Sequence, residues 1–327
     1  MDGITKLNTI TRDFFYKHLD VERAMSVNTI RTYRDGLKMY LSFIGSKHTP
    51  TFEDFTAETV MAFLNNYEQN GQRGTRSRNQ RLAMLKSLAK YVSFLYPEDS
   101  DQMSRIRLIM PKKPVRRIVG YLERNEMDAV LEAARSHHCG DHYYPMFLFM
   151  YHTGARVSEV AELTIGQLHL NTKTVLIHGK GNKDRVIPLV TKLASILKET
   201  ISGREGSTDA PVFLNRYGCK YSRRGIAYAL KSVLSEAVKA VPTIGLKRIS
   251  PHCIRHTTAM HLLQAKTDMN SIRLWLGHTS IETTNIYVET DPEMKRETLK
   301  NAHLEIPAFK PKRWKPTDDI FDFLESL

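Results

Sequence analysis

A short basic segment, MPKKPVRRIVG at residues 110–120, interrupts the helical pattern and is the feature that most constrains the fold. It holds two prolines, four basic residues and few apolar ones, a composition typical of a linker rather than of a packed element. A chain of 327 residues is also long enough for two domains. We therefore expect one domain over residues 1–110, a linker over 111–119 and a second domain from residue 120.

The first hundred residues follow a helical repeat. Ser26 is a suitable N-cap, and apolar residues recur at helical spacing after it as far as Ile44. A second repeat runs from Val60 to Tyr67 and stops at the glycines of NGQRG, and a third helix starts at about Ser77. The N-terminal domain is therefore expected to be helical.

The second half of the chain changes period. YPMFLFMYHTG, which ends at Gly154, is almost wholly apolar and predicts a buried helix. TVLIHGKGNKDRVIPLV predicts a β-hairpin with its turn at 179–182. ISPHCIRHTTAMHLLQA predicts a helix capped by Ser250. We expect a fold that is mainly α with a small antiparallel sheet (α+β), with the second domain over 120–305 and a tail over 306–327.

Composition narrows the class of partner. The net charge of +13 and the pI of about 9.5 favour a polyanion, most simply DNA or RNA. The sequence contains no apolar run long enough to span a bilayer, and its N-terminus lacks the order of a secretion signal. Three widely spaced cysteines favour a reduced compartment. We expect a cytoplasmic protein that binds no membrane.

Four arginines surround the start of the third helix, in QRGTRSRNQR. Backbone N–H groups and guanidinium forks at a helix N-terminus suit phosphate groups, so this segment is a candidate DNA contact. An ordinary solvated charged face explains the pattern equally well. The four residues are Arg73, Arg76, Arg78 and Arg81.

Two pairs of charged residues lie three positions apart at predicted helix starts. Arg156 and Glu159 share a helix face, as either a weak surface ion pair or an anion clamp held in place by Glu159. His252 and Arg255 share the first turn of another helix, where free N–H groups and the dipole favour a bound anion. A polar helix start without a ligand is the simpler explanation of the second pair.

Lys180 and Tyr287 each have an ordinary and a chemical interpretation. A lysine at a hairpin tip is usually solvated, but it can also hand a proton to a departing oxygen. A tyrosine usually packs in a core. With a pKa of about 10, it becomes a nucleophile only where cations stabilise the phenolate and the phosphoryl transition state.

A metal site is a further alternative. His252 and His256 lie four residues apart on one helix, and HHCGDH occupies 137–142. A third ligand with suitable spacing is not evident, so we expect no metal.

In their order along the chain, these segments resemble those of tyrosine recombinases of the integrase/Xer type. The match covers about residues 11–300 and rests on SVNTIRTYRDGL, TGARVSE, GKGNKDR, HCIRHTTA and LGHTSIETTNIY. The resemblance implies a helical, SAM-like core-DNA-binding domain over 1–110 and a catalytic domain over 120–305. It also implies site-specific cutting and rejoining of duplex DNA through a 3′-phosphotyrosine, with no cofactor and no metal.

The resemblance also implies a role for each site residue. Tyr287 would be the nucleophile, and Lys180 would be the general acid for the 5′-oxygen. His252 would assist proton transfer, and Glu159 would support the site. Three residues would bind the scissile phosphate, namely Arg156, Arg255 and His278.

The implied partners are double-stranded DNA and further copies of the chain. Members of the family act as tetramers on two DNA sites, with or without a second recombinase, in integration, excision or resolution of mobile elements. We expect residues 316–327 of the tail to form a short amphipathic helix that docks on its own domain or on a neighbouring subunit. The alternative functions are DNA relaxation by a type IB topoisomerase and DNA binding by a catalytically idle regulator.

Overall fold

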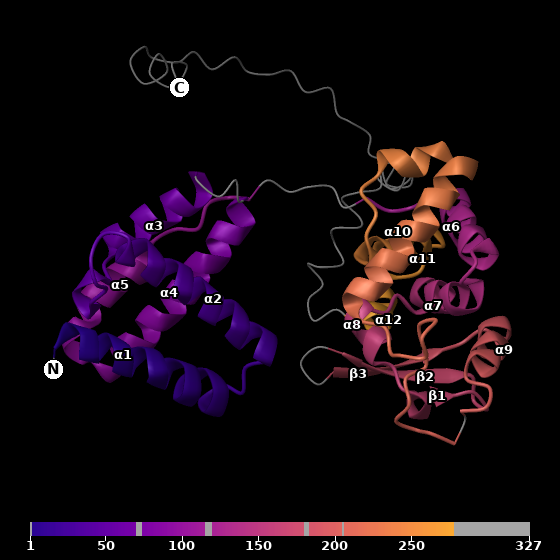
Figure 1. The fold of residues 1–327 in the computed structure, drawn as a ribbon, viewed down its shortest axis with the longest axis horizontal. Coiled ribbons are helices and arrows are strands. Elements are labelled where there is room, and N and C mark those ends of the chain that lie inside the picture. Colours follow the sequence, from indigo (N-terminus) through magenta and orange to yellow (C-terminus); the bar gives the residue numbers. More distant parts are fainter. Residues whose placement is uncertain (1, 70–73, 115–119, 180–182, 205, 278–327) are drawn as a thin grey trace, which may run out of the picture. The chain divides into compact units, whose positions relative to one another are not determined.

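The computed structural model divides into two compact units. The N-terminal unit is Met1–Arg117 and the C-terminal unit is Ile118–Leu327 (Figure 1). Within them the structure describes five stretches, residues 2–69, 74–114, 120–179, 183–204 and 206–277. The predicted fold class, mainly α with a small antiparallel sheet, is confirmed. Among the described residues, no helix combines the length and the apolar character needed to cross a membrane.

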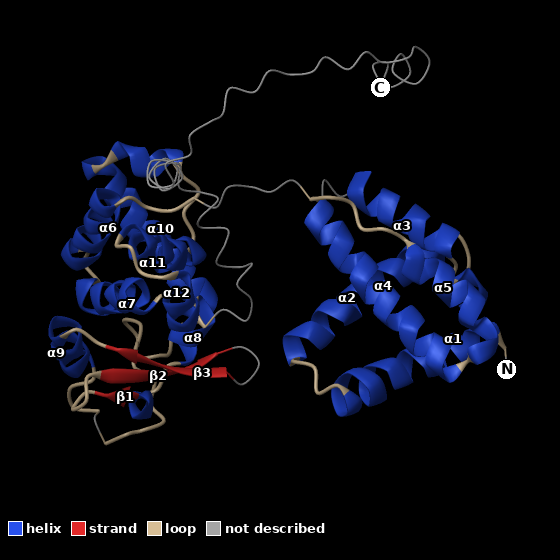
Figure 2. Ribbon diagram, turned by 180° about the vertical axis from the view of Figure 1, so that it is seen from behind, coloured by secondary structure: helices blue, strands red, loops and turns tan. Residues whose placement is uncertain are grey.

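The described part of the N-terminal unit is helical (Figure 2). Helix α4 contacts three of the other α-helices, α2, α3 and α5. A π-helical segment, Phe14–Glu22, continues α1, and short 3-10 turns precede α3 and α5. The α-helices are α1 (Gly3–Asp13), α2 (Val27–Gly45), α3 (Ala57–Gln69), α4 (Thr75–Leu95) and α5 (Ser100–Leu108).

Local sequence signals place these helices well. The Ser26 side chain accepts the backbone N–H of Thr29 at 3.3 Å, which confirms Ser26 as the N-cap of α2. Helix α4 begins at Thr75, two residues before the predicted start at Ser77. The glycines expected to end α3 lie partly outside the described residues, and α3 itself ends at Gln69.

Helices α2 and α4 approach closely at Gly36. A Cβ added there would lie 3.0 Å from Cε of Met84 and 3.1 Å from Nη1 of Arg81, so a larger residue would require these two side chains to shift. Nη1 of Arg81 in turn donates to the carbonyl of Thr32 at 3.1 Å. Arg81 therefore joins the two helices from inside the unit.

The C-terminal unit combines helices with one sheet, and the sheet lies along one side of the helices in both views (Figures 1 and 2). Its helices are α6 (Arg124–Ser136), α7 (Gly140–Thr153), α8 (Val157–Glu162), α9 (Thr191–Thr200), α10 (Arg223–Ala240), α11 (Pro251–Gln264) and α12 (Met269–Leu276). Short 3-10 turns lie at Ile165–Gln167 and Pro242–Leu246.

The sheet has three antiparallel strands in the order β1-β2-β3. The predicted hairpin is confirmed as β2 (Thr174–Gly179) and β3 (Lys183–Pro188), and a short strand β1 (Leu168–His169) adds to its other edge. Val175 and Ile187 are paired in register, and both are buried. Inward and outward side chains alternate along each strand, so one face of the hairpin packs against the unit and the other meets solvent.

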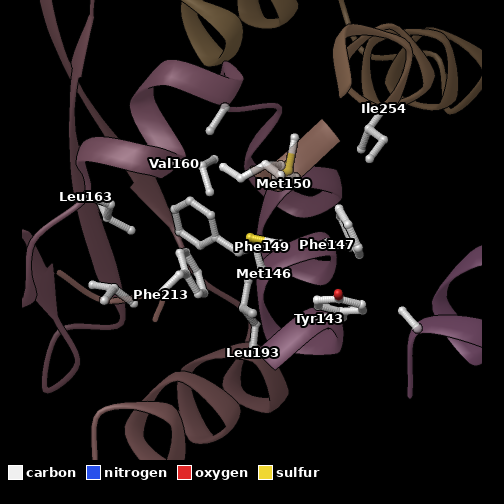
Figure 3. Packing of buried hydrophobic residues seen from close by; sticks show 14 of the residues in the cluster. Tyr143, Met146, Phe147, Phe149, Met150, Val160, Leu163, Leu193, Phe213 and Ile254 are labelled. Atoms are coloured by element: carbon white, nitrogen blue, oxygen red, sulfur yellow. The ribbon is translucent and has the colours of Figure 1, made fainter. Parts of the chain in front are cut away.

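Helix α7 forms the centre of the core of this unit, as its almost wholly apolar sequence predicts. Phe147 and Phe149 are fully buried, and Phe149 packs against Phe213 with ring centroids 5.5 Å apart (Figure 3). Each such side chain contributes roughly 1.5–3 kcal/mol when it leaves water. The helix ends at Gly154, which adopts φ +62° as its left-handed C-cap. The chain then turns directly into α8, which carries the first candidate site residues.

Candidate active site

Arg156 and Glu159 form a largely buried ion pair at the start of α8. Oε2 of Glu159 accepts the backbone N–H of Arg156 at 2.8 Å, and Oε1 accepts Nη1 of Arg156 at 2.7 Å. The Glu159 side chain is only 5% exposed, which distinguishes this pair from the weak surface pairs of solvated helix faces. The predicted pairing is confirmed, and it fixes the guanidinium of Arg156 where the helix begins.

A second arginine, Arg185 of β3, binds the same carboxylate. Its Nη1 donates to Oε1 of Glu159 at 3.2 Å and its Nη2 donates to Oε2 at 2.7 Å. With the two bonds from Arg156, four N–H groups now fill a carboxylate that has about four lone-pair sites. Arg185 was not among the site residues predicted from the sequence. The sequence does contain an indication that Arg185 points inward. Side chains alternate between the two faces of a strand, and Arg185 lies on the same face as the buried Ile187 and Leu189.

Glu159 is held in its charged form. Burial alone raises the pKa of this carboxyl, but the hydrogen bonds and positive charge of Arg185, followed by the bonds from Arg156, hold the pKa below its ordinary value. The group therefore carries a negative charge at neutral pH, between two guanidinium groups.

Arg255 of α11 reaches the same region from another element and is 4% exposed. Its Nη1 donates to the carbonyl of Gly154 at 2.8 Å, and its Nη2 donates to the carbonyl of Leu276. Nη2 of Arg156 donates to the next carbonyl, that of Gly277, at 3.3 Å. Two arginines from different helices therefore hold two successive carbonyls at the end of α12.

The end of α12 suits this arrangement. Gly277 is the C-cap of the helix and adopts φ +64°, a conformation that favours glycine. The last carbonyls of a helix lack intrahelical partners and carry partial negative charge, so they attract guanidinium groups. His278 is the next residue along the chain. The first two residues of the candidate segment LGHTSIETTNIY, Leu276 and Gly277, are therefore the ones whose carbonyls bind the two arginines.

His252 lies in the first turn of α11, and its side chain is exposed. Desolvation and the positive charges of Arg255 and Arg156 lower its pKa, so its imidazole is neutral at pH 7. His256 lies one turn further on, where burial, with His252 and Arg255, lowers its pKa to about 4.

Four predicted residues lie outside the described residues, and nothing in the structure bears on their positions. Gly179 and Lys183, which flank residues 180–182, are paired in the hairpin, and Gly277, which precedes His278, is the C-cap of α12. The four are Arg73, Lys180, His278 and Tyr287.

The arginines near the start of α4 do not share one surface, contrary to the expectation of a single phosphate site. Arg76 is exposed, whereas Arg78 is 5% exposed with its Nε 3.8 Å from Glu68. Arg81 is half-buried between α2 and α4, where it donates to the Thr32 carbonyl. The reason is helical geometry: residues two and five positions after Arg76 turn toward the interior of the unit. Arg78 and Arg81 are therefore placed as interior contacts.

An exposed basic face of α10 escaped the sequence analysis. Arg224, Tyr228 and Lys231 recur at i, i+4 and i+7, and all three are exposed, with Tyr228 at 74%. Ser222 caps this helix by accepting the N–H of Gly225 at 3.0 Å. Cations beside an aromatic ring on one helix face are typical of nucleic-acid surfaces. The signal was available in the spacing of SRRGIAYALK.

Within the described residues, one group of side chains has the spacing of a metal site. It comprises His137, His138 and Cys139, whose ligand atoms lie within 4.8 Å of one another. Both ring nitrogens of His137 are already engaged, with the N–H of Cys139 at 3.1 Å and the hydroxyl of Ser232 at 3.0 Å. Ligation by His137 would break one of these hydrogen bonds, so the group does not fit a metal well.

In comparisons with known proteins, both units match domains of phage integrases. Residues 120–294 match the phage integrase family, and residues 13–93 match the N-terminal SAM-like domain of phage integrases. The chain is 34% identical over 328 residues to a putative integrase/recombinase of Sinorhizobium fredii, covering 98% of each. It is 30% identical over 298 residues to the tyrosine recombinase XerC of Bacillus subtilis, covering 88% of this chain and 94% of the relative.

Solved structures share the fold. The XerH site-specific recombinase bound to its difH substrate has a TM-score of 0.65 at 23% identity, over 89% of this chain and 83% of that chain. A lambda integrase dimer bound to a COC′ core site has a TM-score of 0.60 at 17% identity, over 95% of this chain and all of that chain. With the family match over more than half of the sequence, these findings show that the chain belongs to the phage integrase family and is a tyrosine recombinase.

Proposed function

We propose that this recombinase cuts and rejoins double-stranded DNA at specific sites through a 3′-phosphotyrosine intermediate, with Tyr287 as the nucleophile. The observation that supports this most directly is the convergence of Arg156 and Arg255 on the carbonyls of Leu276 and Gly277. The segment that carries Tyr287 leaves from that point. A short chain of ten residues from Gly277 therefore links the arginine pair to the phenol.

The two arginines act on the charge of the phosphate. Each guanidinium presents several N–H donors in a planar fork that matches phosphate oxygens. Because Arg255 is almost fully buried, its interaction with an anion is less weakened by solvent. Loss of one such preorganised donor costs on the order of 3–4 kcal/mol of transition-state stabilisation. His278 joins this clamp in our assignment.

Proton transfer completes the step. The phenol oxygen of Tyr287 forms a bond to phosphorus as the bond to the 5′-oxygen breaks, and Lys180 gives its proton to that oxygen. His252 is neutral at pH 7 because its pKa is lowered, so it is able to accept the proton that leaves the phenol. The ester retains the bond energy, and attack by a 5′-hydroxyl reverses the reaction without a nucleotide cofactor.

The DNA surface is assigned to both units. In the N-terminal unit, which we assign as the core-DNA-binding domain, Arg76 is the exposed member of the predicted cluster. In the catalytic unit the exposed face of α10 adds Arg224, Tyr228 and Lys231. A net charge of +13 supports this assignment. We assign residues 111–119 as the linker and a homotetramer on two sites as the active assembly, acting in the cytoplasm.

Replacement of Tyr287 by phenylalanine tests the proposal. Tyr287→Phe removes only the phenol oxygen, so it should bind the recombination site as the wild type does and form no covalent adduct. The measurement is a denaturing gel of protein incubated with a nicked site that traps the cleaved strand. A denaturant-resistant adduct formed by Tyr287→Phe would sink the assignment.

A further inference from the structure

We propose that Arg185 is a positioning residue for DNA cleavage, which balances the charge of Glu159 so that Arg156 remains available to the scissile phosphate. This inference rests on the proposed function, in which Arg156 binds that phosphate. Arg185 itself lies on β3, on the strand that follows the hairpin turn with Lys180.

The charges of Glu159 and Arg156 explain why a second arginine beside them matters for anion binding. Glu159 anchors Arg156 through a side-chain bond of 2.7 Å, and that bond also draws on the positive charge of Arg156. A carboxylate and one guanidinium would form a neutral pair with little attraction for an anion. With Arg185 bound to the same carboxylate, two positive groups face one negative group, and one positive charge remains in excess.

The geometry assigns the larger share of the carboxylate to Arg185. Its two terminal nitrogens bind both oxygens of Glu159, at 3.2 and 2.7 Å, whereas Arg156 places one side-chain nitrogen on one oxygen. The side chains of Arg185 and Glu159 are 8% and 5% exposed, so solvent screens their attraction little. The side chain of Arg156 is more exposed than these two, at 27%.

Arg185 also contacts the end of α12. A Cβ added to Gly277 would lie 3.2 Å from Cδ and 3.3 Å from Nη1 of Arg185, so the arginine packs directly against this glycine. The Gly277 carbonyl is the one that Arg156 binds. One side chain therefore links three parts of the site, namely the Lys180 hairpin, the start of α8 and the residue before His278.

A double-mutant cycle with Glu159 separates charge balance from simple packing. Arg185→Met keeps the length of the side chain and removes its charge, which leaves Glu159 to neutralise Arg156. Cleavage at saturating DNA should fall on the order of 100-fold, the size that follows a displacement of about 1 Å in a catalytic group. Site affinity should change by no more than about threefold, because most of the binding comes from the wider DNA surface.

Arg185→Met/Glu159→Gln should cleave at least about tenfold faster than Arg185→Met alone, because the neutral amide that replaces the carboxylate no longer competes for Arg156 and contacting mutations couple. A merely structural role for Arg185 predicts the opposite, since a second change in the same buried network would add to the damage. Single-turnover cleavage of a nicked site, followed on denaturing gels, gives the rates. Gel-shift titration gives the affinities.

The matched control removes a cation from a buried carboxylate elsewhere in the same unit. Lys247 binds Glu126, whose side chain is 3% exposed. Lys247→Met should lower thermal stability as Arg185→Met does, but it should leave the cleavage rate at saturating DNA unchanged. Should Arg185→Met fail to fold, Arg185→Gln with and without Glu159→Gln carries the same comparison. Glutamine also removes the positive charge, so cleavage should fall and Glu159→Gln should again restore part of it.

Two outcomes overturn the inference. The first is Arg185→Met, or its glutamine substitute, cleaving at the wild-type rate, and the second is a double variant that cleaves no faster than the Arg185 single variant. Failure of the proposed function would be visible separately. In that case Arg156→Lys, measured on the same substrate, would retain near wild-type cleavage, whereas a wrong inference about Arg185 alone would leave Arg156→Lys inactive.

Discussion

The 5′-oxygen that leaves phosphorus needs a proton, and Lys180 is the residue that we assign to supply it. If so, the loss of activity in Lys180→Ala should be largely restored by a substrate with sulfur in place of the bridging 5′-oxygen. A thiolate leaves without protonation, so the general acid becomes unnecessary for that substrate. The measurement compares single-turnover cleavage of the oxygen and sulfur substrates by the variant and by the wild type.

Lys198→Ala serves as the matched control, because Lys198 is an exposed lysine on α9 of the same unit. It should cleave both substrates at the wild-type rate. Equal defects of Lys180→Ala on oxygen and sulfur substrates would show that Lys180 binds the phosphate instead of protonating the leaving group.

His256 predicts how stability depends on pH. Its folded-state pKa is about 4, lowered by burial and by the charges of His252 and Arg255, whereas an unfolded histidine titrates near 6.5. Between these values the unfolded chain binds the extra proton, so stability is complete above about pH 6.5 and falls as the pH drops toward 4. At pH 5 the loss from this residue should be about 2 kcal/mol.

Denaturant unfolding at pH 7.5 and pH 5 measures this loss. Tryptophan fluorescence reports on the catalytic unit through Trp275, which lies on α12. The difference between the two pH values should shrink in His256→Gln and stay unchanged in the control His169→Gln, a change of an exposed histidine. His256→Gln with the full wild-type pH dependence would contradict the assignment.

At this same scale, spacing along the sequence predicted part of the site. Arg156 and Glu159 are three positions apart at a helix start, so their contact follows from helix geometry and is confirmed. The contact of Glu159 with Arg185 crosses 26 positions and depends on how the hairpin packs against α8. The inward parity of Arg185 marks it as unusual, but the sequence does not tell which acid it meets.

Among the elements, the junction between α7 and α8 depends on one glycine. Gly154 has φ +62°, and a Cβ added to it would overlap Cδ2 of Leu276. Gly154→Ala should therefore combine a left-handed backbone cost of roughly 1–2 kcal/mol with overpacking of about 1–3 kcal/mol. Because the Gly154 carbonyl also accepts Nη1 of Arg255, the variant should cleave DNA more slowly as well.

Gly203 supplies a control, because it also has a left-handed backbone conformation but has no atoms close to an added Cβ. Its φ is +76°, and nothing lies within 4 Å of an added Cβ. Gly203→Ala should show only the backbone cost and normal cleavage. Thermal unfolding and single-turnover cleavage of the two variants would test this, and equal effects at both glycines would exclude a role for the contact with Leu276.

Helix and hairpin signals in the sequence were sufficient to locate most elements along the chain. They did not predict which face of each element is buried. The hairpin strands lie where alternation predicted them, whereas β1 has two residues and is too short to give a periodic signal. Helix α4 was predicted, yet its arginines were expected on one surface. Arg78 instead lies inside, 3.8 Å from Glu68 of α3, because the packing of α3 against α4 decides which face is buried.

At the scale of the whole molecule, the tail predicts a test of assembly. Residues 316–327 lie outside the described residues, and their sequence combines Asp318 and Asp319 with an apolar stripe at i, i+3, i+4 and i+7. So short a helix is marginal by itself in water and is expected to dock. We propose that it docks on a neighbouring subunit. Its deletion should then leave binding of one DNA site intact and abolish pairing of two sites.

The double change Phe323→Ala/Leu324→Ala should reproduce the deletion, because it removes the apolar stripe and keeps the charges. Asp318→Asn/Asp319→Asn changes the charge and keeps the stripe, so it should still recombine. Gel-shift assays with one and two sites, followed by a plasmid recombination assay, measure both properties. Full recombination by the truncated chain would show that subunits contact one another elsewhere.

Because Arg156 and Arg255 both bind carbonyls at the end of α12, the stability of this helix end and the binding of phosphate are linked equilibria. Arg156 and Arg255 bind the carbonyls of Gly277 and Leu276 through N–H groups that phosphate oxygens also attract. A phosphate that competes for these donors loosens the last turn of α12, and by reciprocity a firmly held turn weakens phosphate binding by the same free energy. Variants at positions away from the DNA that raise amide-exchange protection at the end of α12 should therefore lower site affinity, and variants that lower this protection should raise the affinity.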